Sequence, residues 1–227
     1  MKKRVKRIVA SGIILAGILA NGVAVSAAPK AEEAENNKLP FTDVSETDWF
    51  YSAVEKIYDG KIMLGPEDNK FSPYEKLARA QLAVIVHRME EEPKTEAETI
   101  FEDVSGTEWY GKPVLWAAEN GIVTGYENGY FGPADQITRE QTAVILYRYA
   151  KYKGEDVSDS ADVTSYKDAE SIQPFAKEGM NWAVANGIVK GKDLDGDSQP
   201  ETLDPQGSAT RAECAVMIQR FMDKYQE

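Results

Sequence analysis

The strongest constraint on this chain is an internal repeat of about 60 residues. Copy one, at residues 41–92, aligns without a gap on copy two, at residues 101–153, when the sequence is shifted by 60 residues, and a third copy with two insertions follows at residues 166–225. Aromatic, acidic, glycine and arginine residues recur in the same order in each copy, as in Phe41-x-Asp43-Val44 and Phe101-x-Asp103-Val104. A period of this length is typical of repeat architectures, in which each unit buries its apolar face against its neighbours. We therefore expect three units that fold together.

Each unit has the pattern of a helix, a loop and a second helix. The first helix is predicted near residues 48–59, 110–120 and 174–186, and a glycine-rich turn follows each one. The second helix carries apolar residues at i, i+3, i+4 and i+7. In the third copy this stripe contains Cys214, which therefore belongs to the core rather than to a reactive site. His87, near the end of its helix, is expected to serve packing or the surface. The pattern predicts an all-α fold.

The first residues have the features of a cleaved secretory signal peptide at residues 1–27. Five basic residues precede an apolar run, and small residues close the segment at Ala27. The alternative is a membrane anchor, but the apolar run is shorter than the ~20 residues that span a bilayer. Residues 28–40 are acidic and polar, which predicts a disordered leader. We expect a secreted protein that has no membrane segment after cleavage.

Charge and composition exclude several classes of function. The chain has 38 acidic and 26 basic residues, a net charge of −12 that becomes −17 when the signal peptide is removed. Such a protein has no general attraction for nucleic acids. One cysteine excludes an internal disulfide, and one histidine argues against a histidine-based zinc site or catalytic triad. We expect neither enzymatic activity nor a cofactor.

A polar motif opens each second helix. In Thr138 to Gln141 and in Thr210 to Glu213, the threonine and the Glu or Gln form a capping box. That role does not explain the arginine between them, because a cation in the first turn opposes the helix dipole. An arginine beside free backbone amides would form a site for a carboxylate or phosphate. The alternative is a buried salt bridge between this arginine and the early aspartate of a unit. The residues concerned are Arg79, Arg139 and Arg211, with Asp43, Asp103 and Asp168.

Across residues 41–225, the ordered motifs Phe-x-Asp-Val, Asn-Gly-Ile-Val-x-Gly, Phe-x-Pro and Thr-Arg-Ala-Glu resemble those of S-layer homology domains. The resemblance implies a pseudo-threefold assembly whose grooves bind secondary cell-wall polysaccharide, often carrying pyruvate ketals on amino sugars. It also implies that the arginine, the early aspartate, a turn glycine and a tryptophan contact the ligand. Here these are Arg79, Arg139, Arg211, Asp43, Asp103, Asp168, Gly121, Gly187, Trp116 and Trp182.

The resemblance favours a secreted protein that anchors noncovalently to the cell wall or the S-layer of a bacterium. Its expected partner is an anionic polysaccharide, which the arginine fork can bind through a carboxylate. An S-layer or other surface protein is a second candidate partner. Two alternatives stay open at this point: a structural array protein whose repeats bind one another, and a cell-wall hydrolase. The hydrolase is the weaker of the two, because the repeats already account for every segment.

Two local departures lead to further expectations. Copy one has Ala78 in place of the capping threonine, and Lys56 and Lys61 where copy two has Trp116 and Gly121. The groove that relies on copy one is therefore expected to be weak or altered. In copy three, an insertion that includes Asp193, Asp195 and Asp197 places oxygens at the spacing of a calcium loop. The alternative is an acidic surface turn, and the sequence alone assigns no metal.

Overall fold

The computed structural model describes residues 39–193, 196 and 199–225. The predicted signal peptide and residues 28–38 of the leader lie outside the described residues. The all-α prediction is confirmed, because the described residues form six α-helices, two 3₁₀ turns and only isolated β-bridges. The helices are α1 (Tyr51–Asp59), α2 (Arg79–Met89), α3 (Gly111–Glu119), α4 (Arg139–Lys153), α5 (Lys177–Ala185) and α6 (Arg211–Tyr225), with the 3₁₀ turns η1 (Ala169–Ser171) and η2 (Pro174–Ala176) between α4 and α5.

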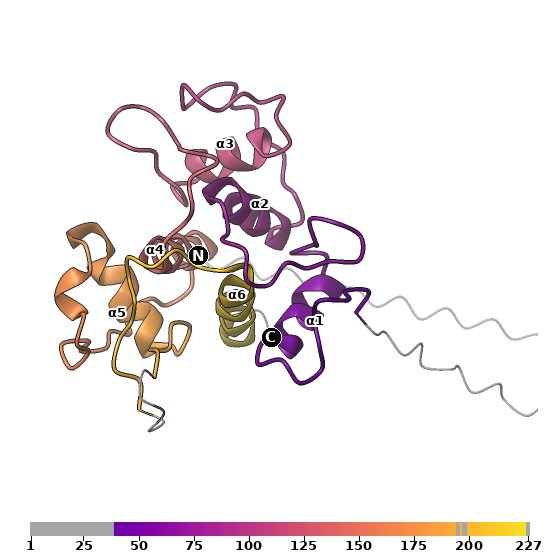
Figure 1. The fold of residues 1–227 in the computed structure, drawn as a ribbon. Helices are drawn as coiled ribbons and strands as arrows, with labels where there is room; N and C mark the ends of the chain where they lie inside the picture. Colours follow the sequence, from indigo (N-terminus) through magenta and orange to yellow (C-terminus); the bar gives the residue numbers. More distant parts are fainter. Residues whose placement is uncertain (1–38, 194–195, 197–198, 226–227) are drawn as a thin grey trace, which may run out of the picture. The chain divides into compact units, whose positions relative to one another are not determined.

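The main helix contacts join different units rather than the two helices of one unit. Helix α3 packs on α2, α5 packs on α4, and α1 of the first unit packs on α6 of the third (Figure 1). The order is cyclic, which confirms the expected pseudo-threefold arrangement. The predicted stripe of each second helix forms part of the core, and Cys214 is fully buried within it. Each unit thus buries its apolar face against a neighbour.

A closed ring of backbone hydrogen bonds lies where the three units meet. The N–H of Leu77 donates to Ala209 at 3.0 Å, that of Ala209 to Ile137 at 2.8 Å, and that of Ile137 to Leu77 at 2.9 Å. All three residues are completely buried, and each stands two positions before the arginine that starts a second helix. The ring needs one residue from every unit, so it fixes the three arginines in equivalent places.

The second helices begin with the predicted caps in two units. The Thr138 hydroxyl accepts a hydrogen bond from the backbone N–H of Gln141 at 3.2 Å, and the Thr210 hydroxyl accepts one from the backbone N–H of Glu213 at 3.1 Å. In the first unit Ala78 has no hydroxyl, and only the return bond from its N–H to Gln81 is formed. None of the helices in the described part of the chain has the length and apolar character that crossing a membrane requires.

Candidate ligand-binding grooves

Each arginine that starts a second helix reaches across to the next unit. Nε of Arg79 donates to the carbonyl of Phe131 at 2.9 Å, and its Nη2 donates to that of Thr124 at 3.1 Å. Arg139 makes the same pair of bonds to Leu203 and Lys190, and Arg211 makes them to Phe71 and Leu64. All three residues are 5% exposed. The arginines therefore join neighbouring units as well as carrying charge.

The backbone amides at these helix starts are not free, which corrects the sequence expectation. The N–H of Arg79 donates to Asp135 at 2.9 Å, and that of Ala80 donates to Pro133 at 3.1 Å. Equivalent bonds reach the next unit from the starts of α4 and α6. Carbonyl oxygens of a neighbouring unit thus take the place that was expected for an anion. The first two N–H groups of each second helix are therefore not available to an anion.

The alternative of a salt bridge between each arginine and an early aspartate is also wrong. Asp103 instead accepts the N–H groups of Phe131 and Gly132 at 2.7 and 2.8 Å, and the same Phe131 offers its carbonyl to Arg79. Asp43 and Asp168 hold the equivalent loops beneath Arg211 and Arg139. Each aspartate therefore positions the loop on which an arginine rests.

Each guanidinium uses Nε and Nη2 for these backbone contacts, so Nη1 is the nitrogen that they leave over. In the described part of the chain, Nη1 of Arg79 and of Arg211 has no hydrogen-bond acceptor, whereas Nη1 of Arg139 lies 3.4 Å from Oε1 of Glu213. The Arg79 guanidinium lies 4.7 Å from the ring centre of Phe131, and that of Arg211 lies 4.9 Å from Phe71. Burial lowers the pKa of both arginines from the usual value.

Three equivalent grooves contain these arginines, and each groove is built from all three units. Groove 1 consists of the turn at residues 63–66, one face of α2, Arg211 and Trp109. Groove 2 consists of residues 124–127, α4, Arg79 and Phe175, and groove 3 of residues 188–192, α6, Arg139 and Trp49. Their volumes are about 190, 350 and 290 Å³. Pockets of roughly 300 Å³ or more hold small molecules, so each groove suits a short stretch of a larger ligand.

Sequence reasoning missed two kinds of groove residue. The first is an exposed aromatic side chain at the rim, which is Trp109, Phe175 or Trp49, at 64, 55 and 62% exposure. The second is an arginine on the second helix, which is Arg88, Arg148 or Arg220. Both kinds recur with the repeat period, and that recurrence was the available signal.

The structure does not bring the expected tryptophans to the grooves. Trp116 is 3% exposed and packs on His87 and Tyr152, while Trp182 is 1% exposed and packs on Tyr147. Neither indole presents a free face to a ligand, because both belong to the core. The contact with Trp116 also confirms the packing role of His87.

The expected glycines also lie outside the grooves. Gly121 and Gly187 follow α3 and α5 with φ of +69° and +67°, the left-handed conformation that ends a helix. The groove glycines are Gly65, Gly125 and Gly191, which line grooves 1, 2 and 3. A Cβ at Gly65 would lie 2.0 Å from the carbonyl oxygen of Lys70, so a side chain there would distort the turn.

The insertion of the third unit is closed by a bridge between Lys192 and Thr202. Within it, the N–H of Gly196 donates to Oδ1 of Asp193 at 2.7 Å. Asp195 and Asp197, which the calcium prediction requires, lie outside the described residues. Among the side chains that are described, no cluster of three or more acidic, histidine or cysteine residues is placed to hold a metal ion. The calcium loop therefore stays a prediction.

Comparison with known proteins supports the repeat assignment. The family model described as the S-layer homology domain matches residues 40–83, 100–143 and 165–215. An endoglucanase from Bacillus sp. (strain KSM-635) is 29% identical over 98% of this chain and 23% of its own length. The surface-layer 125 kDa protein of Lysinibacillus sphaericus is 31% identical over 88% of this chain and 16% of its own. A cellulosome-anchoring protein of Acetivibrio thermocellus is 28% identical over 68% of this chain and 34% of its own.

The chain thus spans about a third or less of the length of these relatives. The three family matches fall on the three units, and together they cover most of the residues between 40 and 215. The chain belongs to the S-layer homology domain family.

Proposed function

We propose that this protein is a cell-surface protein that anchors to the bacterial cell wall by binding an anionic wall polysaccharide in its grooves. The observation that carries the proposal is the threefold recurrence of one arrangement. In each groove a recessed arginine, an arginine on a second helix and an exposed aromatic ring come together from different units. The protein acts by noncovalent binding, without catalysis.

The chemistry of the grooves suits an acidic sugar polymer. A guanidinium with a free N–H binds a carboxylate, such as that of a pyruvate ketal, through a charge-assisted hydrogen bond. The aromatic ring at the rim offers an apolar face to a sugar ring. The net charge of −12, or −17 after cleavage of the signal peptide, does not oppose this binding, because exposed charges are screened within about 8–10 Å at physiological salt. Binding is local to the groove.

The relatives support a role at the cell surface. One is named a cellulosome-anchoring protein and another a surface-layer protein. The endoglucanase has less than a quarter of its length in the matched region, so its name does not indicate catalysis in this chain. We assign the shared region to attachment, and we place the protein outside the cell on the strength of the signal-peptide motif.

A wall-binding assay tests the proposal directly. The purified protein is incubated with cell walls before and after chemical removal of their secondary polysaccharide. The triple variant R88Q/R148Q/R220Q removes one cation from every groove, and K94Q is the control for loss of a surface charge. We expect binding that requires the polysaccharide and that falls in the triple variant but not in K94Q. Equal binding to stripped walls would instead indicate peptidoglycan or a protein partner.

A second assay tests the chemical class of the ligand. An N-acetylated amino sugar carrying a pyruvate ketal competes with the wall polysaccharide, and its methyl ester is the uncharged control. If the arginines bind the carboxylate, the acid displaces the protein from walls and the ester does not. Equal competition by both would show that charge does not contribute to recognition.

A further inference from the structure

The third residue of the second helix is glutamine in two grooves and glutamate in the third. It is Gln81 in groove 1, Gln141 in groove 2 and Glu213 in groove 3. In all three units one side-chain oxygen accepts the N–H of the capping residue, from Ala78 at 2.9 Å, Thr138 at 3.2 Å and Thr210 at 2.8 Å. The capping function is therefore common to the three units. The units differ in the second atom of the side-chain head group, which is not used by the cap.

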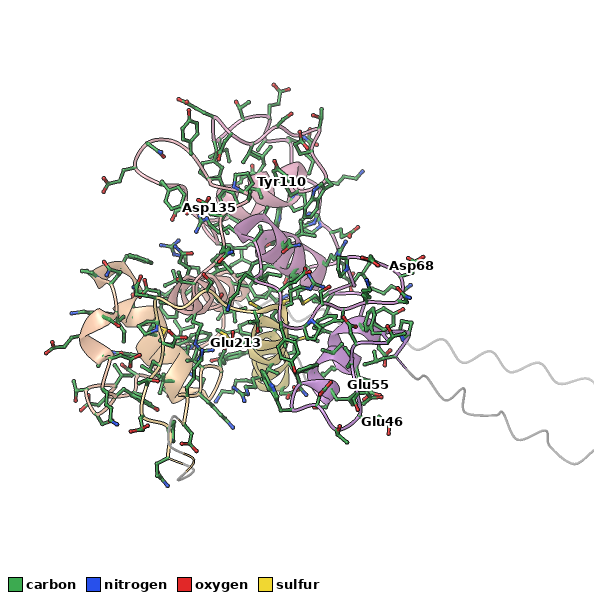
Figure 2. The ribbon with its side chains drawn as sticks, in the orientation of Figure 1. Glu46, Glu55, Asp68, Tyr110, Asp135 and Glu213 are labelled. Carbon is green, nitrogen blue, oxygen red and sulfur yellow. The ribbon has the colours of Figure 1, made fainter. Side chains whose placement is uncertain are left out.

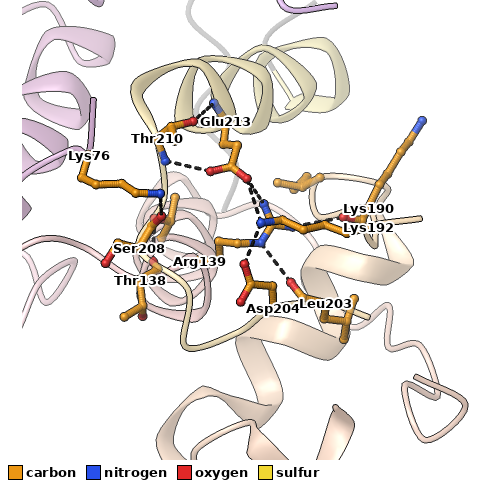
Figure 3. Close-up of polar contacts among 12 residues, drawn as sticks. Lys76, Thr138, Arg139, Lys190, Lys192, Leu203, Asp204, Ser208, Thr210 and Glu213 are labelled. Atoms are coloured by element: carbon orange, nitrogen blue, oxygen red, sulfur yellow. Dashed lines mark hydrogen bonds and ion pairs between the residues drawn. The ribbon is translucent and has the colours of Figure 1, made fainter. Parts of the chain in front are cut away.

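The second atom of the side-chain head group decides what the neighbouring arginine contacts. In glutamine this atom is an NH₂ group, which donates hydrogen bonds and cannot accept one from a guanidinium. In Glu213 it is a carboxylate oxygen, 3.4 Å from Nη1 of Arg139 and 3.2 Å from Nζ of Lys192 (Figure 3). Figure 2 shows Glu213 in the central part of the ribbon, away from Glu46 and Asp68 at its edge.

Although burial alone raises the pKa of Glu213, the Thr210 amide and the charges of Arg139 and Lys192 lower it overall. The carboxylate is therefore ionised at neutral pH.

We propose that Glu213 supplies, within groove 3, the carboxylate contact to the recessed guanidinium that the ligand's anionic group supplies in grooves 1 and 2. The inference rests on the proposed binding of an anionic polysaccharide and adds that the three grooves are unequal. Grooves 1 and 2 are the sites of strong binding, because in the described part of the chain no carboxylate forms an ion pair with their recessed guanidinium. Asp103 and Asp135 near Arg79, and Asp43 and Glu75 near Arg211, act on it only through their charge. Groove 3 is weak toward an anion, since its own carboxylate must first be displaced. Glu213 is thus a specificity-determining residue.

The other charges of groove 3 do not reverse this order. Lys192 lies 2.6 Å from Asp204 as well as 3.2 Å from Glu213, so two carboxylates already neutralise it. Arg220 donates to the carbonyl of Ile188 at 3.3 Å, and Lys190 is exposed, where water and salt weaken its field. Groove 1 has Arg88 and Arg211 and no acidic residue among its lining side chains, although Nε of Arg88 lies 3.6 Å from Glu92 outside the lining. Groove 2 has the exposed Glu127 among its lining residues, so its affinity for an anionic ligand should lie between those of grooves 1 and 3.

The experiment follows each groove separately by its aromatic residue. In ¹⁵N-labelled protein, the indole N–H signals of Trp109 and Trp49 report grooves 1 and 3, and the variant F175W provides a signal for groove 2. Short fragments of polysaccharide released from the walls of the binding assay are titrated in. The variants are E213Q, Q81E and Q141E. All three exchange residues that the chain already tolerates at this position, so the capping bond is kept.

The expected result is a dissociation constant at Trp49 about tenfold weaker than at Trp109, given one competing charge-assisted contact. E213Q should strengthen binding at Trp49 about tenfold and leave Trp109 unchanged. Q81E should weaken binding only at Trp109, and Q141E only at the F175W signal. Equal constants in the unaltered protein, or no effect of E213Q, would overturn the inference while the proposed function stands. If no indole signal moves with any fragment, the proposed function itself fails.

Discussion

Grooves 1 and 3 show two ways of burying the same cation. Arg211 in groove 1 lies over the ring of Phe71 and meets no carboxylate among the lining residues. Arg139 in groove 3 rests on Leu203, which has no ring, and pairs with Glu213. Both arginines make equivalent backbone bonds and are equally buried. An aromatic face can stabilise a cation while leaving its N–H groups available, whereas a carboxylate uses them.

This comparison changes the significance of copy one. Its departures from the repeat pattern led us to expect a weak groove. The structure places them elsewhere: Lys56 pairs with Asp223, and Lys61 takes the left-handed conformation of a helix end with φ of +55°. Neither residue, nor Ala78, is among those that line groove 1. We therefore propose that groove 1, rather than being impaired, is the strongest of the three.

The largest expected effect is the loss of an inter-unit arginine. R211A and R139A each remove two bonds to the next unit, at a cost of about 2–4 kcal/mol in the free energy of unfolding. R139A should be the more destabilising, because it also leaves the Glu213 carboxylate without its guanidinium. Urea unfolding measures both losses. Equal losses would show that the pair with Glu213 contributes nothing to stability.

A somewhat smaller effect is expected for the aspartates beneath the two arginines. D43N and D168N replace one of two accepting oxygens by an NH₂ group that faces a backbone N–H, at a cost of about 1–3 kcal/mol. The two losses should be similar, because the loop support is the same in both grooves. Urea unfolding of the two variants is the measurement. A large difference would mean that the grooves differ in their framework as well as in their charge.

The aromatic rim should affect binding without affecting the fold. Trp109 is 64% exposed, so W109A should change the free energy of unfolding by less than about 0.5 kcal/mol. Retention on cell walls should fall about tenfold, since the ring supplies the apolar contact of the strong groove. W49A, in groove 3, should have a smaller effect on retention. If W49A is the more damaging variant, the proposed order of the grooves is wrong.

The fold was predictable because its signal is distributed over many residues. A period of 60 residues, the apolar stripes of the second helices and the Thr138 and Thr210 caps each follow from local sequence. The site was harder to predict. The sequence identified the recessed arginines, but it could not show that neighbouring carbonyls cover the helix amides, because those carbonyls come from another unit.

The tryptophans show the same limit. Trp116 and Trp109 both lie in or beside the first helix of unit two, and the sequence does not distinguish the core face from the rim. Only the packing of α3 on α2 decides that Trp116 is buried and Trp109 exposed. The difference between Gln81 and Glu213 was visible in the sequence, but its meaning depends on the distance to an arginine of another unit.

The smallest predicted effect is a pH dependence that only groove 3 should show. The folded-state pKa of Glu213 lies below its ordinary value of 4.5, so its ionised form contributes stability above about pH 4.5. That contribution disappears as the pH falls through the lowered folded-state pKa. At pH 7 we expect E213Q to be less stable than the unaltered protein by up to about 1 kcal/mol, because glutamine keeps the capping bond and loses only the contact with Arg139.

The difference in the free energy of unfolding between E213Q and the unaltered protein should shrink steadily when urea unfolding is repeated from pH 5 to pH 3. The variant Q81E provides the matched case, since it places a new carboxylate in the groove of Arg211, which forms no ion pair among the described residues. It should raise the stability of the protein at neutral pH and lose that gain over the same acid range. If this difference in the free energy of unfolding stays constant with pH, Glu213 is not held as a carboxylate by Arg139. Groove 3 would then have no internal anion, and its difference from groove 1 would have to come from Leu203 and the lysines.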